Sequence, residues 1–233
     1  MKEYLKKAQE VIDEIDGNIN GLSREEVSLR QHKFGHNKLN ETKKQSLVEK
    51  FLEKLIDPMT IVLIIAALIS AITSVYSNES FADVIIIALV VIINAVLGVL
   101  QESKAEKALD ALKEITAATS KVLRNGNHEI VKSEEIVPGD IIILEAGDLI
   151  PADARVIESA SLKVEESALT GESLPVDKIS DALKVSDKSD VPLGDRKNMV
   201  YTGSTVVYGR GKAVVTGIGM NTEMGKIANA LSS

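Results

Sequence analysis

The sequence predicts an α+β membrane protein, in which a hairpin of two transmembrane helices is joined to a small antiparallel β domain and to helices near the N-terminus. Two long apolar runs, at 58–76 and 81–100, predict the transmembrane hairpin. Short β-type segments with frequent turn residues after residue 116 predict the sandwich or barrel. Apolar residues spaced three and four apart before residue 56 predict the N-terminal helices.

The two apolar runs are long enough to cross a bilayer. Each has about 20 residues, which as a helix spans about 30 Å of hydrocarbon. Neither run contains Lys or Arg. The alternative is a pair of buried helices in a soluble protein, but the stretch 84–91 is apolar on every face, whereas a core helix is usually striped. The membrane hairpin is therefore the favoured interpretation.

The distribution of lysines predicts the orientation of the hairpin. Residues 77–80, the connection between the runs, include no basic residue. Both flanks are basic, through Lys43, Lys44, Lys50, Lys54, Lys104, Lys107 and Lys113. Because basic loops stay on the cytosolic side, both termini are expected in the cytosol and the short connection outside.

Helix signals precede the first apolar run. A single apolar stripe over residues 4–15 predicts a helix that Gly17 ends. Ser23 and Glu26 form a capping box that starts a second helix. A third helix is expected to start near Ser46 and to run without a break into the first span.

Strand signals follow the second span. The segments expected to be strands are 121–124, 128–132, 141–144, 154–157, 162–165, 204–208 and 212–216. Asn125-Gly126 predicts a tight hairpin between the first two. The last two are expected to face each other across Gly209-Arg210-Gly211. Thr222 is expected to cap a final helix over 223–231.

Composition excludes several classes of function. The net charge is −7, with 34 acidic residues and no basic tract, which argues against a nucleic-acid partner. The chain has no cysteine, so disulfides, a thiol nucleophile and cysteine-based metal sites are excluded.

Three segments stand in an informative order after the hairpin. They are Pro138-Gly139-Asp140, Gly147-Asp148-Leu149-Ile150-Pro151-Ala152-Asp153 and Leu169-Thr170-Gly171-Glu172-Ser173-Leu174-Pro175. Each by itself is an ordinary turn or loop. Their order, spacing and position resemble the actuator domain of P-type cation-transporting ATPases of the calcium-pump-like type II branch. The resemblance covers the chain from about residue 21 onward.

The resemblance implies a fold and a division of the chain. The actuator domain is a distorted antiparallel β-sandwich of jelly-roll type. Residues 1–56 would be its N-terminal helical part, 57–102 the transmembrane hairpin, and 103–233 a stalk helix, the β domain and a linker helix.

The resemblance also implies a role for the Thr170–Ser173 loop. Pumps of this family pass through an aspartyl-phosphate that must be hydrolysed, and Glu172 would position the attacking water when the actuator domain rotates onto the phosphorylation domain. Gly171 would let the backbone approach a phosphorylated partner closely. Thr170 and Ser173 would shape the loop by hydrogen bonding. The simpler alternative is that Glu172 is a solvated loop charge.

An acidic stripe, Glu49, Glu53 and Asp57, repeats every four residues before the first span. In related calcium pumps, acidic residues near this point are thought to line a cytosolic access path for the cation. The ordinary alternative is a solvated helix face beside the lipid headgroups. No bound metal site is expected in this chain.

The remaining parts of a pump are expected outside these residues. The chain has no Asp-Lys-Thr-Gly, the phosphorylation sequence of the family, so we expect a portion of a longer ATPase that is inactive alone. ATP and Mg²⁺ would bind the phosphorylation and nucleotide-binding domains. The partners of this chain would be those domains, the other membrane helices of the same pump, and the bilayer. The resemblance favours Ca²⁺ as cargo. The alternatives are another cation (sodium or potassium, proton, magnesium) or a membrane-anchored regulatory or interaction module without catalysis.

Overall fold

The computed structural model describes residues 2–39, 45–77, 80–115, 118–184 and 191–232. The chain divides into two compact units, one made of residues 42–116 and the other of residues 1–41 together with 117–233. We call them the helical unit and the β unit. The segment 103–115 and the helix before the first span both group with the helical unit.

The helical unit contains α3 (Leu47–Leu55), α4 (Pro58–Ser77) and α5 (Ala82–Ile115). The prediction that the helix from Ser46 continues unbroken into the first span was wrong, because α3 ends before Ile56 and α4 begins at Pro58. Proline has no N–H to donate and disfavours helical backbone in the residue before it. The Asp57 carbonyl and carboxylate instead accept hydrogen bonds from the first turn of α4.

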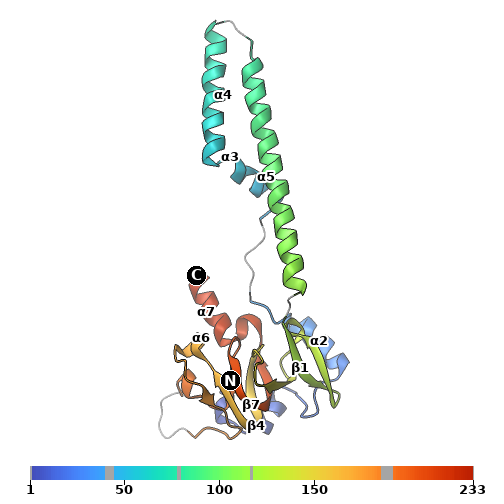
Figure 1. Cartoon of the computed structure of the whole chain (residues 1–233). Coiled ribbons are helices and arrows are strands. Elements are labelled where there is room, and N and C mark those ends of the chain that lie inside the picture. Colours follow the sequence, from blue (N-terminus) through green and yellow to red (C-terminus); the bar gives the residue numbers. More distant parts are fainter. Residues whose placement is uncertain (1, 40–44, 78–79, 116–117, 185–190, 233) are drawn as a thin grey trace. The chain divides into compact units, whose positions relative to one another are not determined.

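Helices α4 and α5 form the expected hairpin (Figure 1). The buried residues Val91, Ala95 and Val99 lie four apart on one face of α5. The candidate membrane spans are Pro58–Tyr76 and Ala82–Leu109, and only 6% and 17% of their apolar windows are buried within the structure. Most of the other apolar side chains are exposed, which is the pattern of lipid-facing helices and not of helices in a soluble core.

Ion pairs attach α3 to α5. The Lys50 ammonium is buried and lies between the carboxylates of Glu102 and Glu106. Lys54 pairs with Glu102 at 2.9 Å. The Lys54 stem covers Gly98, where an added Cβ would lie 3.4 Å from the lysine Cδ. The absence of a side chain at Gly98 therefore lets α3 and α5 approach closely.

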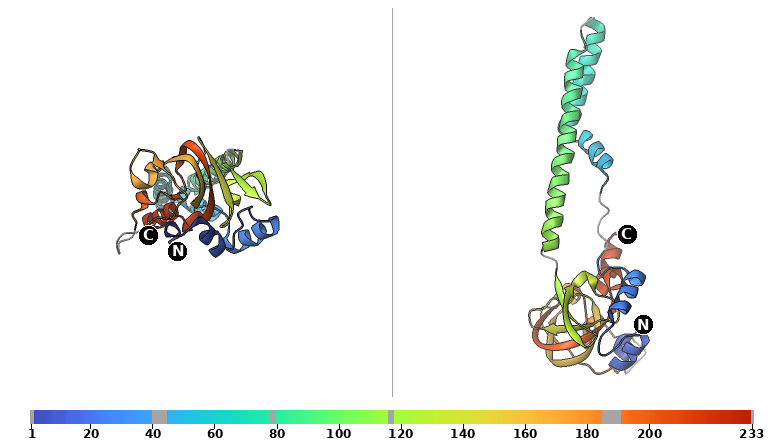
Figure 2. Two further views of the ribbon diagram at one scale, coloured as in Figure 1. Left: turned by 90° about the horizontal axis from the view of Figure 1, so that it is seen from below. Right: turned by 90° about the vertical axis from the view of Figure 1, so that its right-hand side faces the viewer.

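In its described residues, the β unit is one antiparallel sheet of seven strands with helices against it (Figure 2). The strands are β1 (Thr119–Arg124), β2 (Asn127–Lys132), β3 (Ile141–Glu145), β4 (Asp153–Glu165), β5 (Val176–Asp177), β6 (Met199–Val200) and β7 (Thr205–Gly217). The order is β2-β1-β3-β7-β4-β5, with β6 paired to β4. The helices are α1 (Ala8–Glu14), α2 (Arg24–Phe34), α6 (Ser167–Thr170) and α7 (Glu223–Ser232). The predicted α+β class is confirmed.

Several local predictions are confirmed. Asn125 and Gly126 both have positive φ, at 48° and 74°, as a tight β1–β2 turn requires. The Ser23–Glu26 capping box is present at the start of α2. The Thr222 hydroxyl accepts a hydrogen bond from the Gly225 amide at 3.0 Å and so caps α7.

Two predictions about strand connections were wrong. The segments 204–208 and 212–216 are not a hairpin but halves of one strand, β7, and 154–157 and 162–165 are likewise halves of β4. The pairing of β4 with β7 shifts register at several points. Gly209 lies within β7 and has φ +75°. A Cβ on Gly209 would lie 2.1 Å from the Ser161 carbonyl oxygen. The glycine thus marks a close crossing of two bent strands and not a chain reversal.

The core of the β unit lies inside the bent sheet. Its largest apolar cluster includes Val122, Ile142, Leu162 and Val206, none more than 1% exposed. Val11 and Ile12 of α1 pack against Ile141 and Val214 from the other side. The sheet is therefore covered on both faces, and its turns carry the three family-like segments.

Candidate functional site

The Thr-Gly-Glu-Ser loop connects β4 to β5. The chain leaves β4 at Glu165, makes the single turn α6, and ends that turn at Gly171, which adopts the left-handed conformation with φ 76°. A residue with a Cβ is strained there, so glycine suits this position. The reversal places residues 171–175 at the surface, where all five are exposed.

Hydrogen bonds hold the turn in one shape. The Thr170 hydroxyl donates to the Glu166 carbonyl at 3.1 Å and accepts from the Glu172 amide at 3.2 Å. The Gly171 amide donates to the Ser167 carbonyl at 2.9 Å. The Ser173 hydroxyl makes no hydrogen bond within the described residues. Thr170 is therefore the residue that fixes the backbone of Glu172.

The Glu172 carboxylate is free to meet a partner. Its side chain is exposed, and across the described ranges no donor or cation contacts its carboxylate oxygens. A Cβ added to Gly171 would meet no atom within 4 Å, so the adjoining backbone is open to approach. Leu174, beside them, is 79% exposed. The loop presents a carboxylate and an apolar side chain to the outside.

The aspartates of the other two family-like segments serve the fold instead. The Asp140 carboxylate binds the Arg124 guanidinium at 2.6 and 2.9 Å and accepts from the Val137 amide at 3.0 Å. Asp148 accepts from the Glu145 amide at 2.9 Å. The Asp140 and Asp148 carboxylates stabilise turns and already accept hydrogen bonds within the fold. In this they differ from the Glu172 carboxylate, which has no donor among the described residues.

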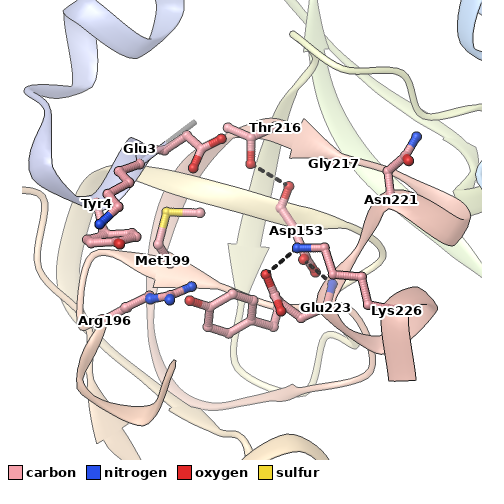
Figure 3. Close-up of a pocket in the computed structure, with 12 residues that line it drawn as sticks. Glu3, Tyr4, Asp153, Arg196, Met199, Thr216, Gly217, Asn221, Glu223 and Lys226 are labelled. Atoms are coloured by element: carbon pink, nitrogen blue, oxygen red, sulfur yellow. Dashed lines mark hydrogen bonds and ion pairs between the residues drawn. The ribbon is translucent and has the colours of Figure 1, made fainter. Parts of the chain in front are cut away.

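Asp153, the last of these aspartates, lines a cavity of about 460 Å³ beside α7 (Figure 3). Its carboxylate accepts from the Thr202 and Glu223 amides at 2.9 and 2.7 Å. Burial raises the pKa of Asp153, and these two hydrogen bonds oppose the rise. Glu223 in turn pairs with Lys226 at 2.7 Å. The Asp153 and Glu223 carboxylates are therefore engaged within the fold.

A buried ion pair that the sequence analysis did not identify lies at the base of the loop. The Glu166 carboxylate and the Lys178 ammonium are 2.6 Å apart, with side chains 1% and 0% exposed. Burial raises the pKa of Glu166 and lowers that of Lys178, while the charge of each partner opposes both changes. The period of two in strands could have revealed Glu166, since it follows the buried Leu162 and Val164 on the same face.

The acidic stripe lies along one hollow of about 560 Å³ in the helical unit. Glu49 accepts from the Ser46 amide at 2.7 Å, and Asp57 accepts from the Met59 amide at 3.2 Å. Glu53 lines the same hollow. Throughout the described part of the chain, no group of three or more His, Cys, Asp or Glu is placed to hold a metal ion.

Comparison with known proteins gives two family matches. Residues 114–232 match the P-type ATPase actuator domain, and residues 3–70 match the N-terminal region of cation transporters and ATPases. The first match covers the β unit from β1 to α7 and includes the Thr-Gly-Glu-Ser loop.

Individual relatives are similar over nearly the whole chain. A calcium-transporting ATPase of Listeria monocytogenes is 46% identical over 233 residues, which is 100% of this chain and 26% of the relative. Calcium-transporting ATPase 1 of Bacillus cereus is 48% identical over 97% of this chain and 25% of its own length. A probable cation-transporting ATPase F of Mycobacterium tuberculosis is 40% identical over 89% and 22%. This chain spans about a quarter of the length of these curated relatives. With its actuator domain, its cation-ATPase N-terminal region and two candidate membrane spans, the chain belongs to the P-type ATPase family.

Proposed function

We propose that this chain forms the actuator domain and first two spans of an ATP-driven calcium pump, and that Glu172 promotes hydrolysis of the aspartyl-phosphate intermediate. The observation that carries the proposal is an exposed carboxylate without a partner in the described structure, on a loop that Thr170 and Gly171 hold in one conformation. The other acidic residues of the family-like segments are engaged within the fold.

The proposed chemistry needs one proton acceptor in the right place. A water oxygen attacks the phosphorus of the aspartyl-phosphate, the bond from phosphorus to the aspartate oxygen breaks, and the products are a free carboxylate and inorganic phosphate. Glu172 orients the water and accepts its proton. The open backbone at Gly171 lets the loop come close to a phosphorylated domain.

We further propose that rotation of the actuator domain gates the membrane helices, with both flanks of the hairpin in the cytosol. Helix α5 runs unbroken from Ala82 to Ile115, from the second span to a point just before β1 in the sequence. A rigid helix of this length can transmit a displacement of the attached domain to the membrane. The lysines on both flanks of the hairpin support the orientation.

In a full-length pump that contains this region, Glu172→Gln should leave phosphoenzyme formation intact and slow its hydrolysis by at least about 100-fold. Glutamine keeps the size of the side chain but cannot accept the proton. The measurement is phosphorylation with radiolabelled ATP, a chase with unlabelled ATP, and acid quenching over time.

Asp177→Asn is the matched control for this experiment. Asp177 is an exposed carboxylate on the same hairpin, and its partner is Lys163 at 3.2 Å. Its substitution should leave phosphoenzyme decay unchanged. Decay of the Glu172→Gln phosphoenzyme at the rate of the unsubstituted pump would refute the role given to Glu172.

We propose that the cargo is Ca²⁺ and that ATP and Mg²⁺ bind other domains of the pump. The relatives from Listeria and Bacillus, which are named for calcium transport, support this choice. Acid-stable phosphoenzyme should form from ATP when Ca²⁺ is added and should not form with Na⁺, K⁺ or Mg²⁺ alone. Equal phosphorylation without Ca²⁺ would assign the pump to another cation.

A further inference from the structure

The Glu166–Lys178 ion pair lies where the backbone gives the loop little support. Strand β5 pairs with β4 at only two positions, Lys163 with Asp177 and Val164 with Val176. One more hydrogen bond, from the Lys178 amide to the Leu162 carbonyl at 2.8 Å, completes the base of the loop. Glu166 comes just after the paired residues of β4 and Lys178 just after those of β5, so in this antiparallel pair the two side chains reach across the short ladder, and their charged groups meet at 2.6 Å.

Stability alone does not explain this pair. Both side chains are at least 99% buried, and within the described residues neither carboxylate oxygen nor the ammonium hydrogen-bonds to any other group. Removing two charges from water is costly, and apolar residues of similar volume are often as stable or more stable. A salt bridge has a narrower range of geometries than an apolar contact, so it can set the relative position of the two strands.

Glu166 is also the residue through which the loop is fixed. Its carbonyl accepts from the Leu169 amide at 2.9 Å, the Thr170 amide at 3.0 Å and the Thr170 hydroxyl at 3.1 Å. The same hydroxyl accepts from the Glu172 amide at 3.2 Å. A shift of Glu166 is therefore passed through Thr170 to the backbone of Glu172.

We propose that the buried Glu166–Lys178 pair is a positioning element for Glu172, which sets the direction of its carboxylate during phosphoenzyme hydrolysis. The inference rests on the proposed function of Glu172. Neither residue of the pair is exposed, so neither contacts the reacting phosphoryl group, and both act through the loop.

The test is phosphoenzyme decay in the full-length pump with a charge-free pair, Glu166→Leu with Lys178→Met. No unpaired charge is left buried in this variant, so folding and phosphoenzyme formation should be retained. Decay should be slowed about 10-fold, because small displacements of a catalytic group reduce rates strongly.

A second measurement separates positioning from a general structural effect. If the pair acts through Glu172, adding the charge-free pair to Glu172→Gln should not slow decay beyond Glu172→Gln alone. The exposed pair of Asp177 with Lys163, on the same two strands, supplies the control, and Asp177→Asn should have no effect.

The outcomes distinguish this inference from the proposed function. Slow decay of Glu172→Gln with normal decay of the charge-free pair would overturn the inference and leave the role of Glu172 intact. A multiplicative effect in the combined variant would also overturn it, because the pair would then act separately. Normal phosphoenzyme decay in Glu172→Gln would refute both the proposed role of Glu172 and the positioning role of the Glu166–Lys178 pair.

Discussion

Replacing Asp140 by alanine should destabilise the β unit by about 4 kcal/mol, because it leaves the Arg124 guanidinium buried without its anion. Arg124 and Asp140 form a two-point ion pair at 2.6 and 2.9 Å, with side chains 8% and 0% exposed. The Val137 amide would also lose its acceptor. The Pro-Gly-Asp segment thus contributes stability rather than chemistry.

Amide hydrogen exchange of the whole chain in detergent micelles measures this effect without requiring the two units to unfold together. Protected amides of β3 and β7 should exchange up to about 10³-fold faster in Asp140→Ala, as a loss of about 4 kcal/mol implies. Glu158→Ala is the matched control, since Glu158 forms an exposed ion pair with Lys212 at 3.1 Å. This substitution should lower the free energy of unfolding by less than about 1 kcal/mol. Equal exchange in the two variants would contradict the assignment.

Replacing Arg155 by methionine should release the N-terminal segment from the sheet. The Arg155 guanidinium is fully buried, and burial lowers its pKa to about 10, so it is still charged at neutral pH. It donates to the carbonyls of Lys6 and Ser180, both at 3.0 Å, and to those of Glu3 and Asn198, both at 3.3 Å. Methionine fills similar volume but leaves several buried carbonyls without donors. This should lower the free energy of unfolding of the β unit by about 4 kcal/mol.

In Arg155→Met, the segments that the guanidinium holds should open before the whole β unit unfolds. Residues 3–6 and 180–184 should become open to limited proteolysis in Arg155→Met, while the β1–β2 hairpin stays protected, because only the former segments depend on the guanidinium. Arg210→Met is the control, as Arg210 is an exposed residue of β7. Unchanged cleavage near residues 3–6 would show that other contacts hold this segment.

Local patterns were sufficient for features that depend on neighbouring residues. The apolar runs predict α4 and α5, and the Asn125-Gly126 turn and the Ser23 capping box are present as expected. The exposed Thr-Gly-Glu-Ser loop is placed by Gly171 and Thr170, which lie within it. In each case the determining interactions span only a few residues or depend on hydrophobicity alone.

The sequence could not show which distant segments pair. The hairpin expected across Gly209 is a bend within β7, because that strand pairs along its length with β4 and β3 and crosses closest at Ser161. A glycine favours either a turn or a close crossing, and only the long-range pairing selects between them.

The amino-acid sequence by itself determined the membrane hairpin, the class of the β unit, the family resemblance and the candidate carboxylate Glu172. Only the tertiary structure showed that Arg155 and Lys178 are buried and that Lys178 pairs with Glu166. In isolation, charged residues are expected at the surface, because removing a charge from water is costly. Their burial is stable only where folding brings partners from remote segments, and those partners do not appear in any local pattern.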